Sequence, residues 1–132
     1  MAKIQWPGIG PTIPELTELL ADQQPLAKRC FSACGQPEFR EHLKESGRNQ
    51  VLVAGIETHI CVYQTTRDLR NDGYEVEVVA DAVSSRTAIN KEIGLEKMRL
   101  TGTGITSVET ALFELLGEAG TPAFKEISRL VK

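Results

Sequence analysis

The chain has 132 residues, of which 41% are apolar, and this is enough for one domain with its own core. Fifteen basic and eighteen acidic side chains give a net charge of -3, and the basic ones do not cluster, which argues against a nucleic-acid partner. The longest apolar run, residues 51–56, is far shorter than the ~20 residues that span a bilayer, and the first residues do not have the pattern of a secretion signal, so we expect none. We therefore expect a single domain over residues 1–132, no membrane contact and a cytoplasmic location.

The cysteines and histidines do not form a recognisable ligand pattern. Cys30, Cys34 and Cys61 lack a C-x-x-C spacing and are odd in number, so at least one thiol is free. His42 and His59 belong to no spaced cluster that would complete a tetrahedral site. The sequence therefore predicts no metal and no cofactor, and we interpret Cys30 and Cys34 as packing residues.

Strands alternate with helices along the chain, which is typical of a parallel α/β sheet. The signal is clearest after residue 48. In chain order the expected elements are a helix at 15–21, a possible strand at 26–31, a helix from 37 to a cap at 47, a strand at 51–55, a helix at 58–70, a strand at 76–80, a helix at 88–100, a weak strand at 104–107, a helix at 108–116 and a last helix from 121.

The junction at residues 55–61 is a candidate reaction site. A crossover places the end of the strand and the start of the next helix at the ligand-binding edge of an open sheet. Cys61 is expected in the first turn of that helix, where unpaired N–H groups stabilise a thiolate and could hold an oxyanion. In the alternative reading, Cys61 is a small buried apolar residue.

Residues 55–62 read GIETHICV, and residues 73–86 read GYEVEVVADAVSSR. These segments closely resemble the isochorismatase-like cysteine hydrolase superfamily, and most of all its branch of isochorismatase domain-containing proteins. The likeness covers nearly the whole chain, and it continues through Lys28 and through residues 31–33, 37–39, 105–109 and 111–116. The resemblance implies a Rossmann-like parallel sheet flanked by helices.

The resemblance also implies roles for individual residues. Cysteine-bearing members use an Asp-Lys-Cys triad, in which Cys61 matches the nucleophile that forms a thioester and Lys28 matches the lysine. Without the resemblance, Lys28 would be read as a surface lysine. The family has a non-proline cis peptide before the nucleophile, here Ile56–Glu57, which directs an amide N–H toward the oxyanion. Members that hydrolyse isochorismate lack the cysteine, so Cys61 points away from that substrate.

The residues just before Cys61 are candidates for a pocket that takes a small-molecule substrate. Thr58 is a possible pocket residue. Glu57 and His59 could line the pocket or an interface, or they could be ordinary polar loop residues. Family relatives associate through helices near the site, which implies a homo-oligomer.

The triad aspartate has no equivalent. In the family it ends the first strand, but this chain lacks the first strand, the first helix and most of the second strand, so the domain is expected to be incomplete at its N-terminus. Asp22, the only aspartate before Cys61, is a poor substitute, and no general base is assigned. The strand with Lys28 then has no obvious neighbour, and residues 51–55 show an unpaired edge. The sheet could close over the gap, another chain could supply the missing strands, or the chain is a fragment of a longer protein.

Three functions are compatible with these observations. The first is hydrolysis of an amide or related carbonyl bond through Cys61, assisted by Lys28. The second is a non-catalytic member of the fold that acts as an oligomeric or partner-binding scaffold. The third is a redox sensor in which Cys61 forms a reversible disulfide with Cys30 or Cys34.

Overall fold

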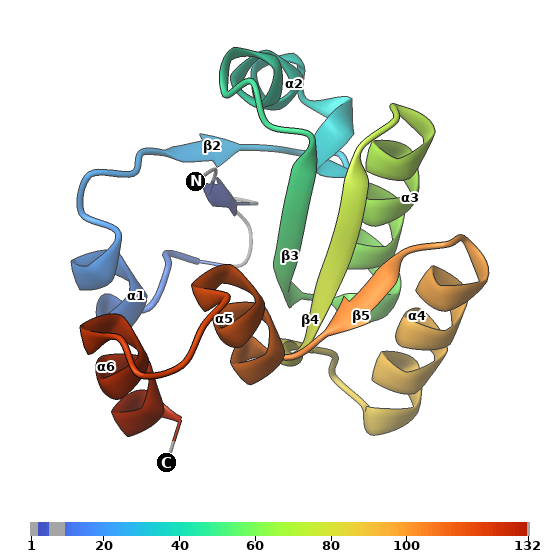
Figure 1. The fold of residues 1–132 in the computed structure, drawn as a ribbon. Helices are drawn as coiled ribbons and strands as arrows, with labels where there is room; N and C mark the ends of the chain where they lie inside the picture. Colours follow the sequence, from blue (N-terminus) through green and yellow to red (C-terminus); the bar gives the residue numbers. More distant parts are fainter. Residues whose placement is uncertain (1–2, 6–9, 132) are drawn as a thin grey trace.

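The structure is a computed structural model that describes residues 3–5 and 10–131 (Figure 1). The strands are β1 (Lys3–Gln5), β2 (Pro25–Ala27), β3 (Gln50–Ile56), β4 (Glu75–Ser84) and β5 (Gly104–Thr106). The α-helices are α1 (Pro14–Leu19), α2 (Pro37–Glu45), α3 (Tyr63–Asn71), α4 (Ala88–Leu100), α5 (Val108–Leu116) and α6 (Pro122–Leu130). A short 3₁₀-helix, η2 (Ala33–Gly35), precedes α2, and a π-helix, η3 (Thr58–Val62), runs directly into α3.

The larger sheet has the order β3-β4-β5, and all its strands are parallel. Helices α3 and α4 lie on one side of it and α5 lies on the other (Figure 1). Because both faces of β4 are covered, Val76, Val78 and Val79 are all buried. The expected α/β fold with a parallel sheet is confirmed, and so is the weak third strand.

The smaller sheet pairs β1 with β2 in parallel, with Ile4 opposite Leu26. The expectation that the strand near Lys28 lacks a neighbour is therefore wrong, because the chain forms a strand at Lys3–Gln5 that no residue pattern announces. The strand itself is also shorter than the expected 26–31. It ends at Ala27, and Ser32, which directly follows the expected strand, caps η2 by accepting a hydrogen bond from the Cys34 N–H.

One edge of β3 is open. Among the described strands, β3 pairs only with β4, and the two sheets do not merge into one. The exposed fractions of Leu52 and Ile56 are 50% and 53%, high for apolar residues of a strand. The unpaired edge is confirmed, and the alternative in which the sheet closes over the gap is wrong for the described strands.

Two apolar clusters form the core. The first joins η2 and α2 to α3 and β4, and the second joins η3 and α4 to the far part of β4. The first contains Ala33, Cys34, Phe39, Leu69 and Val76, and the second contains Val62, Val78, Val83 and Met98. Both therefore pack around the segment that leads through residue 61.

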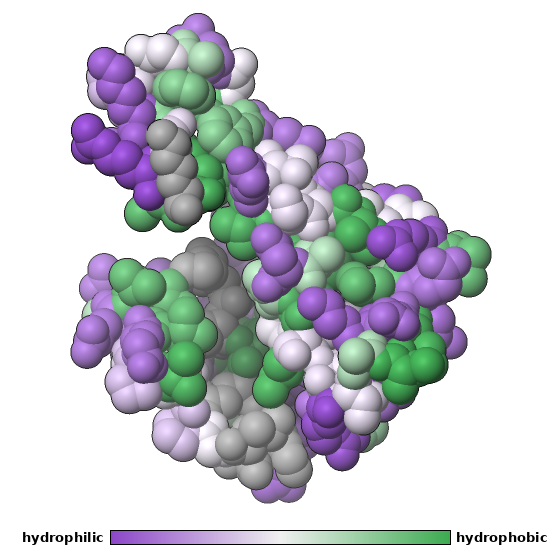
Figure 2. Space-filling view, turned by 90° about the horizontal axis from the view of Figure 1, so that it is seen from below, coloured by the Kyte–Doolittle hydropathy of each residue, from purple (hydrophilic) through white to green (hydrophobic). Residues whose placement is uncertain are grey.

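Apolar residues also reach the surface. Figure 2 shows them in green among hydrophilic residues on the face seen from below. On α4, Ile89, Ile93 and Leu100 are exposed, whereas Gly94 and Met98 are buried, so this helix is apolar on two sides. No helix in the described ranges is long and apolar enough to cross a membrane.

Candidate active site

Cys61 lies in the helical segment that follows β3 and continues into α3. The expected first turn of this segment is the π-helix η3, and the peptide bond before it, Ile56–Glu57, is cis. The Glu57 carbonyl accepts hydrogen bonds from the N–H groups of Ile60 and Val62, at 3.1 and 3.2 Å. Cys61 itself is half-buried and its thiol is free. The expected position at a helix start is confirmed, in π rather than α geometry.

Lys28 reaches Cys61 from the other sheet. Its Nζ lies 3.6 Å from the Cys61 Sγ, and it donates to the carbonyl oxygens of Cys30 and Phe31, both at 2.8 Å. Lys28 is only 9% exposed. A buried ammonium needs partners, and here two carbonyls and one sulfur supply them. The reading of Lys28 as an ordinary surface lysine is wrong.

No carboxylate of the described residues forms a hydrogen bond or ion pair with Lys28 or Cys61. Asp22 lies in the turn after α1 and forms no ion pair within the described ranges. Lysine and cysteine are thus together, and within residues 3–5 and 10–131 no acidic third member bonds to them.

The residues between β3 and Cys61 fasten this loop to the end of β4. Thr58 is fully buried, and its Oγ1 donates to the Ser84 carbonyl at 2.8 Å. His59 Nδ1 lies 3.1 Å from the Ser85 Oγ. The Glu57 carboxylate accepts a hydrogen bond from the Arg86 N–H at 3.1 Å. Beyond these contacts, a substrate-pocket role for Thr58 and His59 stays a prediction.

An open depression lies beside Lys28. It is lined by Ala27, Lys28, Arg29, Cys30, Gly35 and Gln36. None of the residues singled out near Cys61 borders it. The depression therefore places polar and basic groups next to Lys28 but not next to Cys61.

The other two cysteines differ from each other. Cys34 is 4% exposed, and burial raises its pKa to about 11 against the opposing effect of Arg40. Such a thiol stays protonated near neutral pH, in keeping with a packing residue. Cys30 is half-buried, and its Sγ lies so close to Gly35 that a side chain at that glycine would clash with it.

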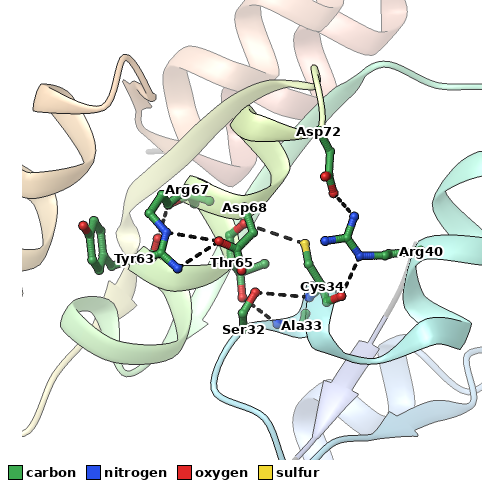
Figure 3. A network of polar contacts seen from close by, with 10 residues as sticks. Ser32, Ala33, Cys34, Arg40, Tyr63, Thr65, Arg67, Asp68 and Asp72 are labelled. Atoms are coloured by element: carbon green, nitrogen blue, oxygen red, sulfur yellow. Dashed lines mark hydrogen bonds and ion pairs between the residues drawn. The ribbon is translucent and has the colours of Figure 1, made fainter.

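Sequence reasoning missed the contacts that join the Lys28 loop to α3. The Ala33 N–H donates to the Thr65 Oγ1 at 2.9 Å, and the Cys34 thiol donates to the Thr65 carbonyl at 3.9 Å. Figure 3 shows Thr65 facing Ala33 and Cys34 across this junction. Thr65 looks like any helix-face threonine in the sequence, and only its spacing of four residues from Cys61 could have drawn attention to it.

Within the described parts of the chain, no group of three or more His, Cys, Asp or Glu side chains is placed to hold a metal ion.

Comparison with known proteins places this arrangement in a family. The chain is 46% identical over 129 residues to the secreted isochorismatase effector Isc1 of Phytophthora sojae, covering 94% of this chain and 61% of that protein. It is 42% identical over 131 residues to the human isochorismatase domain-containing protein 2, covering 97% of this chain and 62% of that protein. The chain thus spans about three fifths of the length of these relatives.

Solved structures share the fold. The MAR1 ribonuclease of Caenorhabditis elegans superimposes with a TM-score of 0.86 at 36% identity, over 97% of this chain and 67% of that one. A pyrazinamidase/nicotinamidase of Streptococcus mutans gives a TM-score of 0.60 at 30% identity, over 69% of this chain and 51% of that one. The isochorismatase domain model matches residues 5–110. With its parallel sheet and the matched segment around Cys61, the chain belongs to the isochorismatase family.

Proposed function

We propose that the chain carries the reaction centre of a cysteine-dependent hydrolase that cleaves an amide or related carbonyl bond of a small molecule. The observation that carries this proposal is the 3.6 Å separation between the Lys28 Nζ and the Cys61 Sγ. The thiolate is the nucleophilic form of a cysteine, and a buried lysine at this distance can pair with it by charge. The likeness to a pyrazinamidase/nicotinamidase supports an amide as the substrate class.

The reaction runs in two steps. The Cys61 thiol gives up its proton to solvent, the thiolate attacks the carbonyl carbon, a C–S bond forms, and the C–N bond breaks as the leaving nitrogen takes up a proton from solvent. Water then attacks the thioester, a C–O bond forms and the C–S bond breaks, so that a carboxylic acid leaves and the protonated thiol is restored. Backbone N–H groups of Ile56, Glu57 and Cys61 are proposed to hold the oxyanion in both steps.

Proton transfer is the weak point of this centre. A positioned acid or base contributes a factor of about 10² to 10⁴, and no carboxylate of the described residues touches the Lys28–Cys61 pair. The relatives are longer than this chain, so a hydrolase activity of the whole protein is proposed here and not inferred from them. We expect this chain alone to turn over slowly.

Hydrolysis of a panel of small primary amides, ureides and carbamates, followed by ammonia release, tests the proposal. Activity above the buffer rate is expected, with C61S inactive and K28M at least tenfold slower, because these variants remove the nucleophile and its charge partner. The exposed lysine variant K44M is the matched control and retains activity. Equal activity in C61S and the unsubstituted chain would contradict the proposal.

A non-catalytic scaffold is the second candidate, and the absence of a contacting carboxylate among the described residues favours it. In that case no panel member is hydrolysed.

Single-stranded RNA is included as a further substrate because one structural relative is a ribonuclease. If the unsubstituted chain cleaves this RNA and C61S does not, the substrate is a phosphodiester and the proposed carbonyl substrate is wrong.

We also propose that copies of the chain associate. Ile89, Ile93 and Leu100 form an exposed apolar stripe on α4, on the side of the helix opposite its buried residues. Such an exposed apolar surface is typical of an interface between proteins. Sedimentation of the chain and of I93E, which places a charge in the stripe, checks this. A cytoplasmic location remains a prediction, and the Phytophthora relative is described as secreted.

A further inference from the structure

We infer that Thr65 is a positioning residue, which sets the distance between Lys28 and Cys61 by joining the loop that holds the lysine to the helical segment that carries the cysteine. The inference rests on the proposed function, in which these two side chains work as a pair.

The lysine is held by its own loop. Its ammonium donates to the carbonyls of Cys30 and Phe31, both at 2.8 Å, so its position follows that of residues 30–31. The sheet that precedes this loop is not hydrogen-bonded to the sheet that leads to Cys61. Apart from the contact between Lys28 and Cys61 itself, the hydrogen bonds that tie this loop to the segment carrying the sulfur come after residue 31.

Thr65 provides the hydrogen bonds between this loop and α3 that lie nearest to Cys61 in the sequence. Its Oγ1 accepts a hydrogen bond from the Ala33 N–H at 2.9 Å, and its carbonyl accepts one from the Cys34 thiol at 3.9 Å. Thr65 is 8% exposed and Ala33 is 4% exposed, so water has little access to replace either group. Because Thr65 follows Cys61 by four residues, about one helical turn, the loop is fixed beside the nucleophile.

Further contacts hold the same loop farther along α3 (Figure 3). The Ser32 side chain lies close enough to the Asp68 carboxylate to lower its pKa. The Arg40 Nε donates to the Cys34 carbonyl at 2.6 Å, and its guanidinium pairs with Asp72. These contacts keep η2 near α3, but Asp68 and Asp72 are farther from Cys61 along the chain than Thr65 is.

The next residue offers a matched control. Thr66 is fully buried on the same helix, and its Oγ1 donates only to the Tyr63 carbonyl at 2.9 Å. Thr→Val at either position removes one hydroxyl from a buried site without changing the volume much. Only the change at Thr65 breaks a bond to the lysine loop.

The test is the rate at which iodoacetamide alkylates Cys61 at pH 7, read on the peptide that contains it by mass spectrometry. We expect T65V to slow alkylation about fivefold, T65S to restore the rate, and T66V to leave it unchanged. K28M slows it as well, and the double variant K28M/T65V is no slower than K28M, because Thr65 acts through the lysine.

A purely structural role gives a different pattern. In that case T65V and T66V lower the unfolding midpoint alike, neither changes alkylation in the folded protein, and the inference is overturned. Additive slowing in K28M/T65V also overturns it. If K28M alone does not slow alkylation, then the Lys28–Cys61 pairing of the proposed function fails, which is distinguishable from a failure confined to T65V.

Should T65V not fold, D68A tests the same junction, since it removes from the surface of α3 the carboxylate whose pKa the Ser32 side chain of the loop lowers. Loss of this negative charge would not by itself slow the reaction of a thiol with iodoacetamide. Slower alkylation in D68A, by about twofold, therefore reports loosening of the loop, whereas faster alkylation contradicts the inference.

Discussion

In the larger sheet, β4 pairs with a neighbour on each edge and its valines are buried on both faces. In the smaller sheet, β1 and β2 pair over three residues, and α1, which connects them, buries none of its residues. Cys61 belongs to the first region and Lys28 to the second. The site is thus assembled across a boundary between a well-packed region and a sparsely packed one.

This difference means that the two members of the pair are secured in different ways. The turn of Cys61 adjoins a core cluster formed by residues of η3, β4 and α4. The lysine depends on two loop carbonyls and on the junction with α3. We therefore expect stability to be governed by the larger sheet, and the separation of the reacting groups to be governed by the junction.

Truncating one leucine in each region gives the largest expected contrast. Leu69 on α3 is 1% exposed, and L69A should lower the free energy of unfolding by about 2–5 kcal/mol through lost burial and a cavity. Leu19 on α1 is 81% exposed, and L19A should change it by less than about 0.5 kcal/mol. Urea unfolding followed by circular dichroism measures both values. A similar loss in L19A would show that α1 is packed as firmly as α3.

The sequence predicts the well-packed region far better than the sparse one. The apolar runs at 51–55 and 76–80 fall within β3 and β4, because continuous β-branched stretches have few alternatives to a covered strand. The strand Lys3–Gln5 is too short to show a period, and its pairing depends on residues more than 20 positions away. Local patterns cannot report such a contact.

The site divides in the same way. Cys61 is identifiable from its place at a strand-to-helix junction, while Lys28 is identified through the family resemblance. The carbonyl acceptors of Lys28 and the bond from Ala33 to Thr65 join residues with no shared period, so they appear only in the folded chain. The resemblance also led us to expect the cis peptide at Ile56–Glu57, which the structure contains.

Gly94 lies where α4 contacts the turn of Cys61, and its substitution should change stability by an intermediate amount. A Cβ built there would lie 2.8 Å from the His59 nitrogen and 2.9 Å from the Thr58 carbonyl carbon, both backbone atoms. Alanine in an open helix position would be more favourable than glycine by about 0.5–1 kcal/mol. Here the clash should reverse the sign, and G94A should destabilise the fold by about 1–3 kcal/mol.

Thermal unfolding of G94A beside E92A, an exposed position on the same helix, measures this effect. Because the clash falls on the residues just before Cys61, the alkylation rate of Cys61 should change in G94A and stay constant in E92A. A stabilised G94A would mean that α4 can move away from η3 at little cost, and that the well-packed region is looser than its burial indicates.

The smallest expected effect concerns pH at the junction. Partial burial acts to raise the pKa of Asp68, but hydrogen bonds from Ser32 and Arg67 outweigh it, so this pKa lies below its usual value in the folded chain. A carboxyl whose pKa is lowered by folding adds stability above its unfolded pKa of about 3.9, and this stability is lost as the pH falls through the lower, folded value. D68N lacks that dependence.

The difference in unfolding free energy between the unsubstituted chain and D68N should therefore be full at pH 6 and shrink as the pH is lowered below about 4. We expect it to stay under about 1 kcal/mol, since the Asp68 side chain is partly open to solvent. Urea titrations at pH 6, 4 and 3 measure it. A difference that grows on acidification would mean that Ser32 and Arg67 do not favour the charged carboxylate, and that the junction is held by Thr65 and Arg40 without Asp68.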